Sequence, residues 1–498
     1  MKDSIAQTLS NRTFQVIFLV YSSLLVFLGR QLDRGITNFD DAYYAQKAKE
    51  IFLSDSLWVV LLKNTPTFDN SPLPFWLTGL AYKVFGVSGY AAVFSSAIFG
   101  VLTIYLTYSL CSYLFKDNWT AFLAAFVLLF PGMFLDSSRR GMLDITLAFF
   151  VTAAMYGLIK GLKDKKFYLL YGVMTGCAVL TKSVLGFFPI AIGVVFMLWR
   201  GGFKKLFDFG YLAGISVAIL VGCSWYAMNW YIFGEVFIKL HFNDGHMKLI
   251  QDSYLEGSLL YLLGYFKDMM KNYWPWFPVT AVGVFLFAKR SFRDKDAHSM
   301  FLFLWVSIPF LIMSTSRNQT LRYLFMIFPA LAMITSHTIA GWLRETHKDK
   351  TLPWMFGIVV ATVLVVNVTP AQVKISLDYN SAEVRRDIAS FVHVNTPPRQ
   401  AVNFYKLSHW NPTWALMFYS DRSVGDIIWD PEGLLERIEK NPRQAWLTNV
   451  WEFRDLEKNF PGRLYLIYAN RKFAYFTSQE NRENVVYDFS DVDLPVIR

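Results

Sequence analysis

The chain has 498 residues, of which 54% are hydrophobic and only 17% are charged. This apolar content and the mean hydropathy of +0.31 exclude a wholly water-soluble protein. The formal net charge is +10, but the basic residues cluster in short segments between apolar runs, as in cytoplasmic loops of membrane proteins. This pattern argues against nucleic acid as a partner.

In chain order, about eleven apolar segments approach the roughly 20 residues that a helix needs to cross a bilayer. They lie near residues 14–32, 88–114, 119–135, 142–160, 167–181, 184–199, 208–230, 273–288, 299–314, 320–341 and 353–370. Leu73 to Phe85 and Ser258 to Phe266 are shorter, so we interpret them as interfacial or re-entrant elements; counting both would give thirteen spans. Ala42 to Leu53 has the spacing of an amphipathic helix in the interface.

Basic residues give the expected orientation. Lysines and arginines gather in four loops, near residues 160–166, 200–205, 289–295 and 344–350, and all four fall on one side under this count. The positive-inside rule predicts that this side and the N-terminus are cytoplasmic. The first apolar run lacks a small-x-small cleavage site, which predicts an uncleaved anchor.

After about residue 372 the pattern changes. Ser381 to Phe391 is predicted to be helical, while Ala401 to Tyr405 and Arg463 to Tyr468 have the pattern of short strands. We therefore expect a mainly α protein with two domains, a helical membrane core over residues 1–372 and a small α/β domain over 373–498. The odd number of spans predicts that the second domain lies outside the cytoplasm.

With this orientation, the unusual ionisable residues fall at outer helix ends or in outer loops, where each is a candidate for function. They are Asp40, Asp41, Asp69, Arg139, Arg140, Asp144, Lys182, His241, Asp244, His246, Arg317 and Arg322.

Each candidate also has a structural interpretation. Asp40 with Asp41 could cap a helix and interact with its dipole, Asp69 could be a solvated loop acid, and Asp144 could form a simple ion pair or cap. Lys182 could snorkel to the interface.

The remaining candidates are weaker individually. His241 and His246 flank Asp244, but this spacing alone is weak support for a metal, and surface-loop histidines are the alternative. The three cysteines lack metal-ligand spacing, so no metal is predicted. Arg317 and Arg322, with Tyr323, could anchor an anionic lipid; arginine also binds phosphate in a bidentate manner.

Together these groups have a chemical use. An aspartate could deprotonate an acceptor hydroxyl while cations stabilise a departing phosphate. A donor used at this place would be membrane-borne.

Five motifs also resemble a known family. The chain is similar to GT-C fold glycosyltransferases related to dolichyl-phosphate-mannose protein mannosyltransferases and to lipid A aminoarabinose transferases. The resemblance covers roughly residues 14–370 and rests on Asp40 to Ala45, Phe68 to Leu77, Arg140 to Asp144, Leu180 to Lys182, and Arg322 and Tyr323 followed by Pro329.

The resemblance implies roles for these residues. Asp40, Asp69 and Asp144 would be catalytic, Lys182 would bind the donor phosphate, and the fold would be a helical core with interfacial helices and an external C-terminal domain. Relatives often have arginine where Tyr43 stands and Lys-Pro where Asn70 and Ser71 stand. We therefore expect further contacts with the donor phosphate from Arg139, Arg140, Arg322 and Tyr323. Acceptor or accessory roles are predicted for Asp41, Tyr43, His241, His246 and Arg317.

The function predicted from the sequence is transfer of a hexose or pentose from a polyprenyl-phosphate donor, with inversion, on the outer face of a bacterial inner membrane. The acceptor is lipid A, another glycolipid, a glycan or a protein, and no cofactor is implied. The alternatives are a glycan ligase with a pyrophosphate-linked donor, a transporter or flippase, and a non-catalytic scaffold. A transporter would require midplane polar groups and paired repeats, and the sequence has neither.

Overall fold

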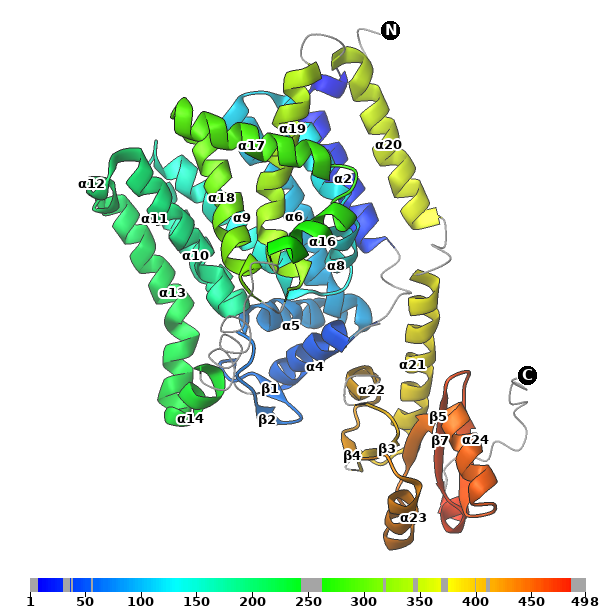
Figure 1. Ribbon diagram of the computed structural model, residues 1–498. Helices are drawn as coiled ribbons and strands as arrows, with labels where there is room; N and C mark the ends of the chain where they lie inside the picture. Colours follow the sequence, from blue (N-terminus) through cyan, green and yellow to red (C-terminus); the bar gives the residue numbers. More distant parts are fainter. Residues whose placement is uncertain are drawn as a thin grey trace.

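The computed structural model describes residues 8–29, 36, 39–54, 57–242, 262–316, 319–343, 348–368, 375–398, 400–408 and 413–484. Most of the described residues are helical, and the helices form a bundle with a smaller sheet-containing domain below it (Figure 1).

A helix occupies each of the eleven segments predicted to span the membrane. The helices of the bundle are α2 (Arg12–Leu28), α6 (Gly89–Phe115), α7 (Asn118–Leu129), α8 (Gly132–Ser138), α9 (Leu143–Gly161), α10 (Phe167–Lys182), α11 (Phe188–Gly201), α13 (Phe209–Phe233), α17 (Phe277–Arg293), α18 (Ala297–Ser314), α19 (Phe328–Leu343) and α20 (Lys348–Val368). Shorter helical segments connect them: α12 (Phe203–Leu206), α14 (Glu235–Ile238), α16 (Leu262–Asn272), and the 3-10 helices η1 (Ser183–Phe187) and η4 (Leu321–Ile327).

Six helical runs in the described part of the chain are long and apolar enough to cross a membrane, or seven if α7 and α8, bent by 76°, count as one span. One of the six, Phe167–Gly201, reverses direction inside. The Tyr171 hydroxyl donates to the Pro189 carbonyl at 2.9 Å, whereas these residues would lie about 27 Å apart on one straight helix. Helices α10 and α11 are therefore antiparallel and joined through η1, in agreement with the two spans predicted there.

A close backbone contact sets the register of α9 against α10. A Cβ on Gly157 of α9 would lie 2.6 Å from the Tyr171 nitrogen of α10, so only glycine allows this approach, as is common between membrane helices. Because the two helices are antiparallel, Asp144 at the start of α9 comes level with Lys182 at the end of α10.

Two helices lie across the lower end of the bundle: α4 (Phe39–Leu53) and α5 (Leu73–Phe85), joined by a hairpin of β1 (Leu61–Leu62) and β2 (Thr65–Pro66) (Figure 1). Both were predicted as interfacial elements. Of the other predicted interfacial element, Ser258 to Phe266, only the part from Leu262 on lies inside the described residues, at the start of α16.

The prediction of a simple amphipathic α4 is wrong in one respect. Its apolar residues are buried as expected, at Ala45, Ala48 and Ile51, but so are the polar residues Gln46, Lys47 and Lys49. The expected polar face is covered by protein, not by water.

The C-terminal domain contains one mixed sheet, in the order β4-β3-β5-β7-β6, in which β3 pairs in parallel with β4 and β5. Its elements are α21 (Ile375–Asn395), β3 (Val402–Tyr405), α22 (Thr413–Ser420), β4 (Val424–Ile428), α23 (Pro431–Lys440), β5 (Trp446–Asn449), α24 (Val450–Asn459), β6 (Leu464–Ala469), β7 (Phe473–Ser478) and the 3-10 helix η5 (Gln479–Asn484). The helix and both strands predicted here from the sequence are confirmed by α21, β3 and β6.

Helix α22 of this domain covers α4. The buried ammonium of Lys49 donates to the Phe418 carbonyl at 2.7 Å and forms an ion pair with Asp421. The Tyr419 hydroxyl accepts a hydrogen bond of 2.8 Å from the Ile36 nitrogen. The C-terminal domain therefore fixes the position of α4, which carries Asp40 and Asp41.

Candidate active site

An ion pair joins the facing ends of α9 and α10. Lys182 Nζ lies 2.5 Å from Asp144 Oδ1, and the Asp144 side chain is only 2% exposed. The ammonium also lies 4.4 Å from the centre of the Tyr323 ring, a cation–π contact. Lys182 therefore does not simply snorkel to the interface; it neutralises a buried carboxylate.

A second ion pair joins α4 to η4. Arg322 Nη1 lies 2.7 Å from Asp40 Oδ2, and both side chains are about one quarter exposed. Helix α4 begins at Phe39, so Asp40 lies in the first turn, where the helix dipole favours a negative charge. Asp40 thus lies inside the helix and not at its N-cap, so of the structural interpretation only the interaction with the helix dipole remains. Its carboxylate is also bonded to a guanidinium 282 residues away.

The two ion pairs form one cluster. Arg322 also interacts electrostatically with Asp144, and its Nη1 lies 3.8 Å from the sulfur of Met142, two residues before that aspartate. Tyr44, on α4, is close enough to respond to both carboxylates. Burial raises the pKa of Tyr44 well above its ordinary value, and the charges of Asp144 and Asp40 add to this effect, so the phenol stays protonated.

A second cluster lies beside the first, on α4 and the loop before α5. Lys47 Nζ donates to Asp69 Oδ1 at 2.5 Å and to Asn70 Oδ1 at 2.9 Å, and the Tyr43 hydroxyl donates to Asp69 Oδ2 at 2.7 Å. The Lys47 side chain is fully buried, whereas that of Asp69 is 49% exposed. The carboxylate therefore faces outward from a buried cation.

Burial and the charges of neighbouring groups together determine the ionisation of this second cluster. Burial lowers the pKa of Lys47, and the nearby Asp69 charge offsets only part of this effect. Burial also acts to raise the pKa of Asp69, but the Lys47 charge and the hydrogen bonds from Lys47 and Tyr43 outweigh it and hold this pKa below its usual value. Asp69 is therefore a carboxylate at neutral pH. Burial and Asp69 together raise the pKa of Tyr43, which keeps its proton.

Two contacts join the clusters. Ser71 and Ser183, the neighbours of Asn70 and Lys182, are hydrogen-bonded through their hydroxyls at 3.1 Å, and the rings of Tyr43 and Tyr44 lie 5.8 Å apart. The three aspartates predicted to be catalytic thus come together at one end of the bundle.

The accessory residue His241 is positioned differently from the surface histidine that we considered. Its side chain is 1% exposed, its ring is stacked on Phe237, and its Nδ1 is hydrogen-bonded to the Phe68 carbonyl. His241 therefore fixes the residue that precedes Asp69.

The other predicted site residues lie around this core. Arg139 is buried at the end of α8, Arg140 pairs with Asp136 at 2.9 Å, and Asp41 is buried with its Oδ1 accepting from the Ala42 nitrogen. His246 and Arg317, with Asp244, lie outside the described residues. Within the described ranges, no group of three or more histidine, cysteine, aspartate or glutamate side chains could hold a metal ion.

Sequence reasoning missed Lys47, which was assigned to the polar face of α4. The available signal was its spacing, since Lys47 follows Tyr43 by one helical turn and so lies on the same face. Trp414 was also missed; its ring lies 5.0 Å from that of Tyr43, so the C-terminal domain contributes an aromatic side chain beside the second cluster.

Comparisons with known proteins show which proteins this chain resembles. Residues 69–227, which include Asp69, Asp144 and Lys182, match the model of the dolichyl-phosphate-mannose-protein mannosyltransferase family. An uncharacterized protein of Aquifex aeolicus is 25% identical over 65% of this chain and 64% of its own length. The undecaprenyl phosphate-alpha-4-amino-4-deoxy-L-arabinose arabinosyl transferase of Erwinia tasmaniensis is 24% identical over 72% of this chain and 66% of its own length.

The fold is also known from a solved structure. The ArnT protein of Cupriavidus metallidurans, in a crystal structure with bound undecaprenyl phosphate, matches with a TM-score of 0.70 at 16% identity, over 93% of this chain and 97% of that one. The chain is therefore an integral membrane protein with the GT-C fold. It is related to the dolichyl-phosphate-mannose-protein mannosyltransferases and the aminoarabinose transferases, which confirms the resemblance seen in the motifs. It spans less than two thirds of the length of these two curated relatives.

The ion pair of Asp144 and Lys182 gives a stability prediction. Replacing Lys182 with Met leaves the buried Asp144 carboxylate without its hydrogen-bonded cation and with only the charge of Arg322 nearby, so we expect a loss of about 3 kcal/mol in the free energy of unfolding in mixed micelles. The double variant Asp144→Leu/Lys182→Met should recover to within about 1 kcal/mol of the original protein, because two apolar side chains can replace a buried ion pair. A Lys182→Met variant as stable as the original would contradict a buried pair at this place.

Proposed function

We propose that this chain is a glycosyltransferase that moves one hexose or pentose from a polyprenyl-phosphate carrier to an acceptor, with inversion at the anomeric carbon. The observation that carries the proposal is the adjacent placement of two ion pairs, Asp40–Arg322 and Asp144–Lys182, at one end of the bundle. The site offers carboxylates for proton transfer and cations for an anionic leaving group.

Arg322 is suited to link donor binding to catalysis. A guanidinium binds phosphate through a planar, bidentate contact, and this one is bonded to Asp40. A donor phosphate that takes over the guanidinium would release the Asp40 carboxylate. The base would thereby become available when the donor is bound.

The proposed reaction is a single displacement. Asp40 removes the proton from the acceptor hydroxyl, and the acceptor oxygen attacks the anomeric carbon from the side opposite the phosphate. The bond between the anomeric carbon and the phosphate oxygen breaks, and the polyprenyl phosphate leaves with the negative charge. Lys182 and Arg322 stabilise this charge. The Tyr323 ring and the Asp144 carboxylate hold the Lys182 ammonium in position.

Lys47 is the proposed replacement for the cations that the chain lacks at Tyr43 and Asn70. It is buried between these two positions, 4.2 Å from the Tyr43 ring centre and 2.9 Å from the Asn70 oxygen. We assign it to the donor phosphate together with Lys182, and we assign the outward-facing Asp69 to the sugar or the acceptor. Arg139 adds positive charge before α9, the charge of Arg140 is balanced by Asp136, and Asp41 and His241 support the local structure.

The names of the relatives support a more specific substrate. The Erwinia tasmaniensis relative is named for undecaprenyl phosphate and an amino-arabinose, and the Cupriavidus metallidurans structure contains undecaprenyl phosphate. We therefore propose an undecaprenyl-phosphate-linked sugar as the donor and lipid A or another glycolipid, before a glycan or a protein, as the acceptor.

Asp40→Asn tests the catalytic assignment. This change keeps the shape of the side chain but removes its charge and basicity, so transfer from a synthetic polyprenyl-phosphate sugar should fall about 100-fold or more. Asp41→Asn should have a milder effect. Asp208→Asn is the matched control, because Asp208 also forms an ion pair, with Lys165 at 2.8 Å, but caps α13 at the other end of the bundle. Asparagine can keep this cap, so the variant should retain transfer within about twofold. Near-normal transfer by purified, folded Asp40→Asn protein would remove Asp40 from the chemistry.

The proposed orientation places this site and the C-terminal domain in the periplasm of a bacterial inner membrane. It is supported by the positive-inside bias of the basic loops. In a protein without its own cysteines, a cysteine introduced at the exposed Asn441 should react with a membrane-impermeant maleimide in intact cells. One at the exposed Asp164 should react only after lysis. The opposite labelling pattern would exclude an external active site.

A further inference from the structure

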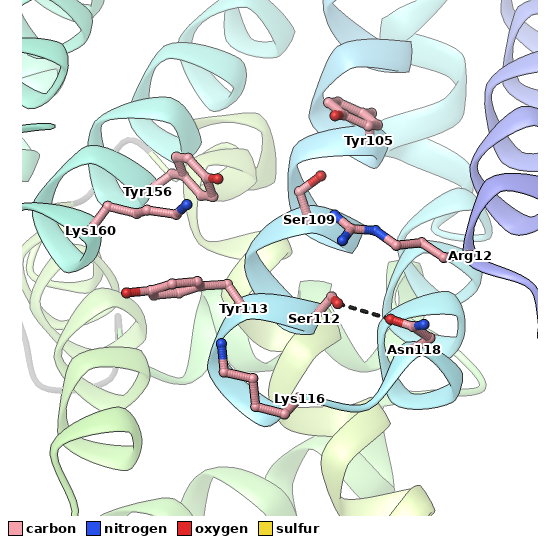
Figure 2. A pocket seen from close by; sticks show the side chains of 9 residues that line it. All are labelled: Arg12, Tyr105, Ser109, Ser112, Tyr113, Lys116, Asn118, Tyr156 and Lys160. Atoms are coloured by element: carbon pink, nitrogen blue, oxygen red, sulfur yellow. Dashed lines mark hydrogen bonds between the residues drawn. The ribbon is translucent and has the colours of Figure 1, made fainter. Parts of the chain in front are cut away.

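A basic cavity lies at the opposite end of the bundle from the ion pairs. It has a volume of about 390 Å³ and is lined by three cations, with hydroxyl groups and one amide between them: Arg12, Tyr105, Ser109, Ser112, Tyr113, Lys116, Asn118, Tyr156 and Lys160 (Figure 2). These lining residues include no carboxylate. The cavity plays no part in the proposed transfer reaction.

Two of the three cations of this cavity, and a third lysine beside it, approach one aromatic ring. Lys116 Nζ lies 4.5 Å and Lys160 Nζ 4.8 Å from the centre of the Tyr113 ring, and Lys163 approaches the same ring at 5.5 Å. Figure 2 shows the Lys116 and Lys160 ammonium groups on either side of this ring. Like charges that share one cavity repel one another, and an anion bound in the cavity would lower this repulsion.

The neighbouring acid takes part in a helix cap. Asp117 follows Lys116 directly, but its carboxylate caps α7 and accepts hydrogen bonds from the Trp119 nitrogen at 3.2 Å and the Thr120 hydroxyl at 2.6 Å. Its charge is directed at the start of that helix.

The walls of the cavity come from separate, well-anchored elements. Arg12 is the first residue of α2, and Asn11 caps that helix. Lys116 ends α6 in the left-handed conformation, with φ of 56°, and Ser112 donates to Asn118 at 3.0 Å across the turn into α7. The cavity therefore has a defined shape and does not depend on one flexible side chain.

Its depth matches the second membrane interface. Lys160 follows Asp144 by sixteen residues on the same helix, a rise of about 24 Å, which approaches the thickness of the hydrocarbon core. Tyr113 and Tyr156, which line the cavity near the ends of α6 and α9, belong to the residue types enriched at the headgroup level.

We propose that this cavity binds a phosphate group, supplied by the headgroup of an anionic phospholipid at the membrane face opposite the transfer site. Phosphate oxygens would accept hydrogen bonds from the Arg12 guanidinium and the Lys116 and Lys160 ammonium groups, and the tyrosine and serine hydroxyls would bind the rest of the headgroup. Scattered positive-inside charges set orientation without a binding site, whereas these three cations share one cavity.

The test uses native mass spectrometry to measure how much phosphatidylglycerol the purified protein retains. The protein is placed in phosphatidylcholine nanodiscs that contain increasing fractions of phosphatidylglycerol. Loss of two cations in Lys116→Gln/Lys160→Gln should weaken retention about 30-fold, and the single change Arg12→Gln, at an exposed position, about fivefold. The control Lys204→Gln/Lys205→Gln removes the same charge from exposed positions on α12 and should change retention less than twofold.

The outcomes separate the possibilities. Equal losses in the cavity and control variants, or no loss in either cavity variant, would overturn the proposal. A second experiment tests the source of the phosphate. It measures the thermal unfolding temperature of the protein in a neutral detergent, with and without inorganic phosphate. If phosphate stabilises the original protein as strongly as phosphatidylglycerol, and the double variant responds to neither, the cavity binds a soluble phosphate and the lipid source is excluded.

Discussion

A buried carboxylate near the end of a membrane helix constrains the geometry of the whole candidate active site. Asp144 is 2% exposed, and an isolated charge there would be too costly to keep. It therefore needs a cation, and the antiparallel packing of α9 on α10, closed by the glycine contact at Gly157, brings Lys182 level with it. Arg322 then interacts with Asp144 as well as Asp40, which ties η4 and α4 to the same point.

The second requirement is that α4 holds its place beneath the bundle. Its lysines are the means: Lys47 is buried against Asp69 and Asn70, and Lys49 against the Phe418 carbonyl and Asp421 of the C-terminal domain. The two lysines of α4 thus bind two different parts of the protein. Lys47 binds residues of the proposed site, and Lys49 binds the C-terminal domain. The C-terminal domain thereby supports the helix that carries Asp40, the proposed base.

Local patterns in the sequence were sufficient for the helices of the bundle and for the four residues that form the two ion pairs. Apolar runs located every bundle helix, and the rarity of charge at membrane depth singled out Asp40, Asp144, Lys182 and Arg322. Partners were not predictable in the same way. The pair between Asp40 and Arg322 joins residues 282 positions apart, and no periodicity encodes such a contact.

Lys47 and His241 were misjudged for a related reason. Amphipathic spacing assumes that water covers the polar face of a surface helix, but α22 and the loop at Asp69 cover that of α4, so a lysine there becomes buried and paired. A histidine in a polar segment likewise suggests a surface loop, yet His241 packs between aromatic rings and holds the Phe68 carbonyl. Burial by distant segments overrides the local pattern in both residues.

The most direct test of the account is a structure of this protein with a polyprenyl phosphate bound, determined by cryo-electron microscopy in nanodiscs. The account predicts the phosphate within hydrogen-bond distance of Arg322 and of Lys182 or Lys47, with the Arg322 guanidinium turned from Asp40 toward the phosphate. A polyprenyl phosphate bound only at the basic cavity of Lys116 and Lys160, or bound at the ion pairs without contact to any of these three cations, would contradict it.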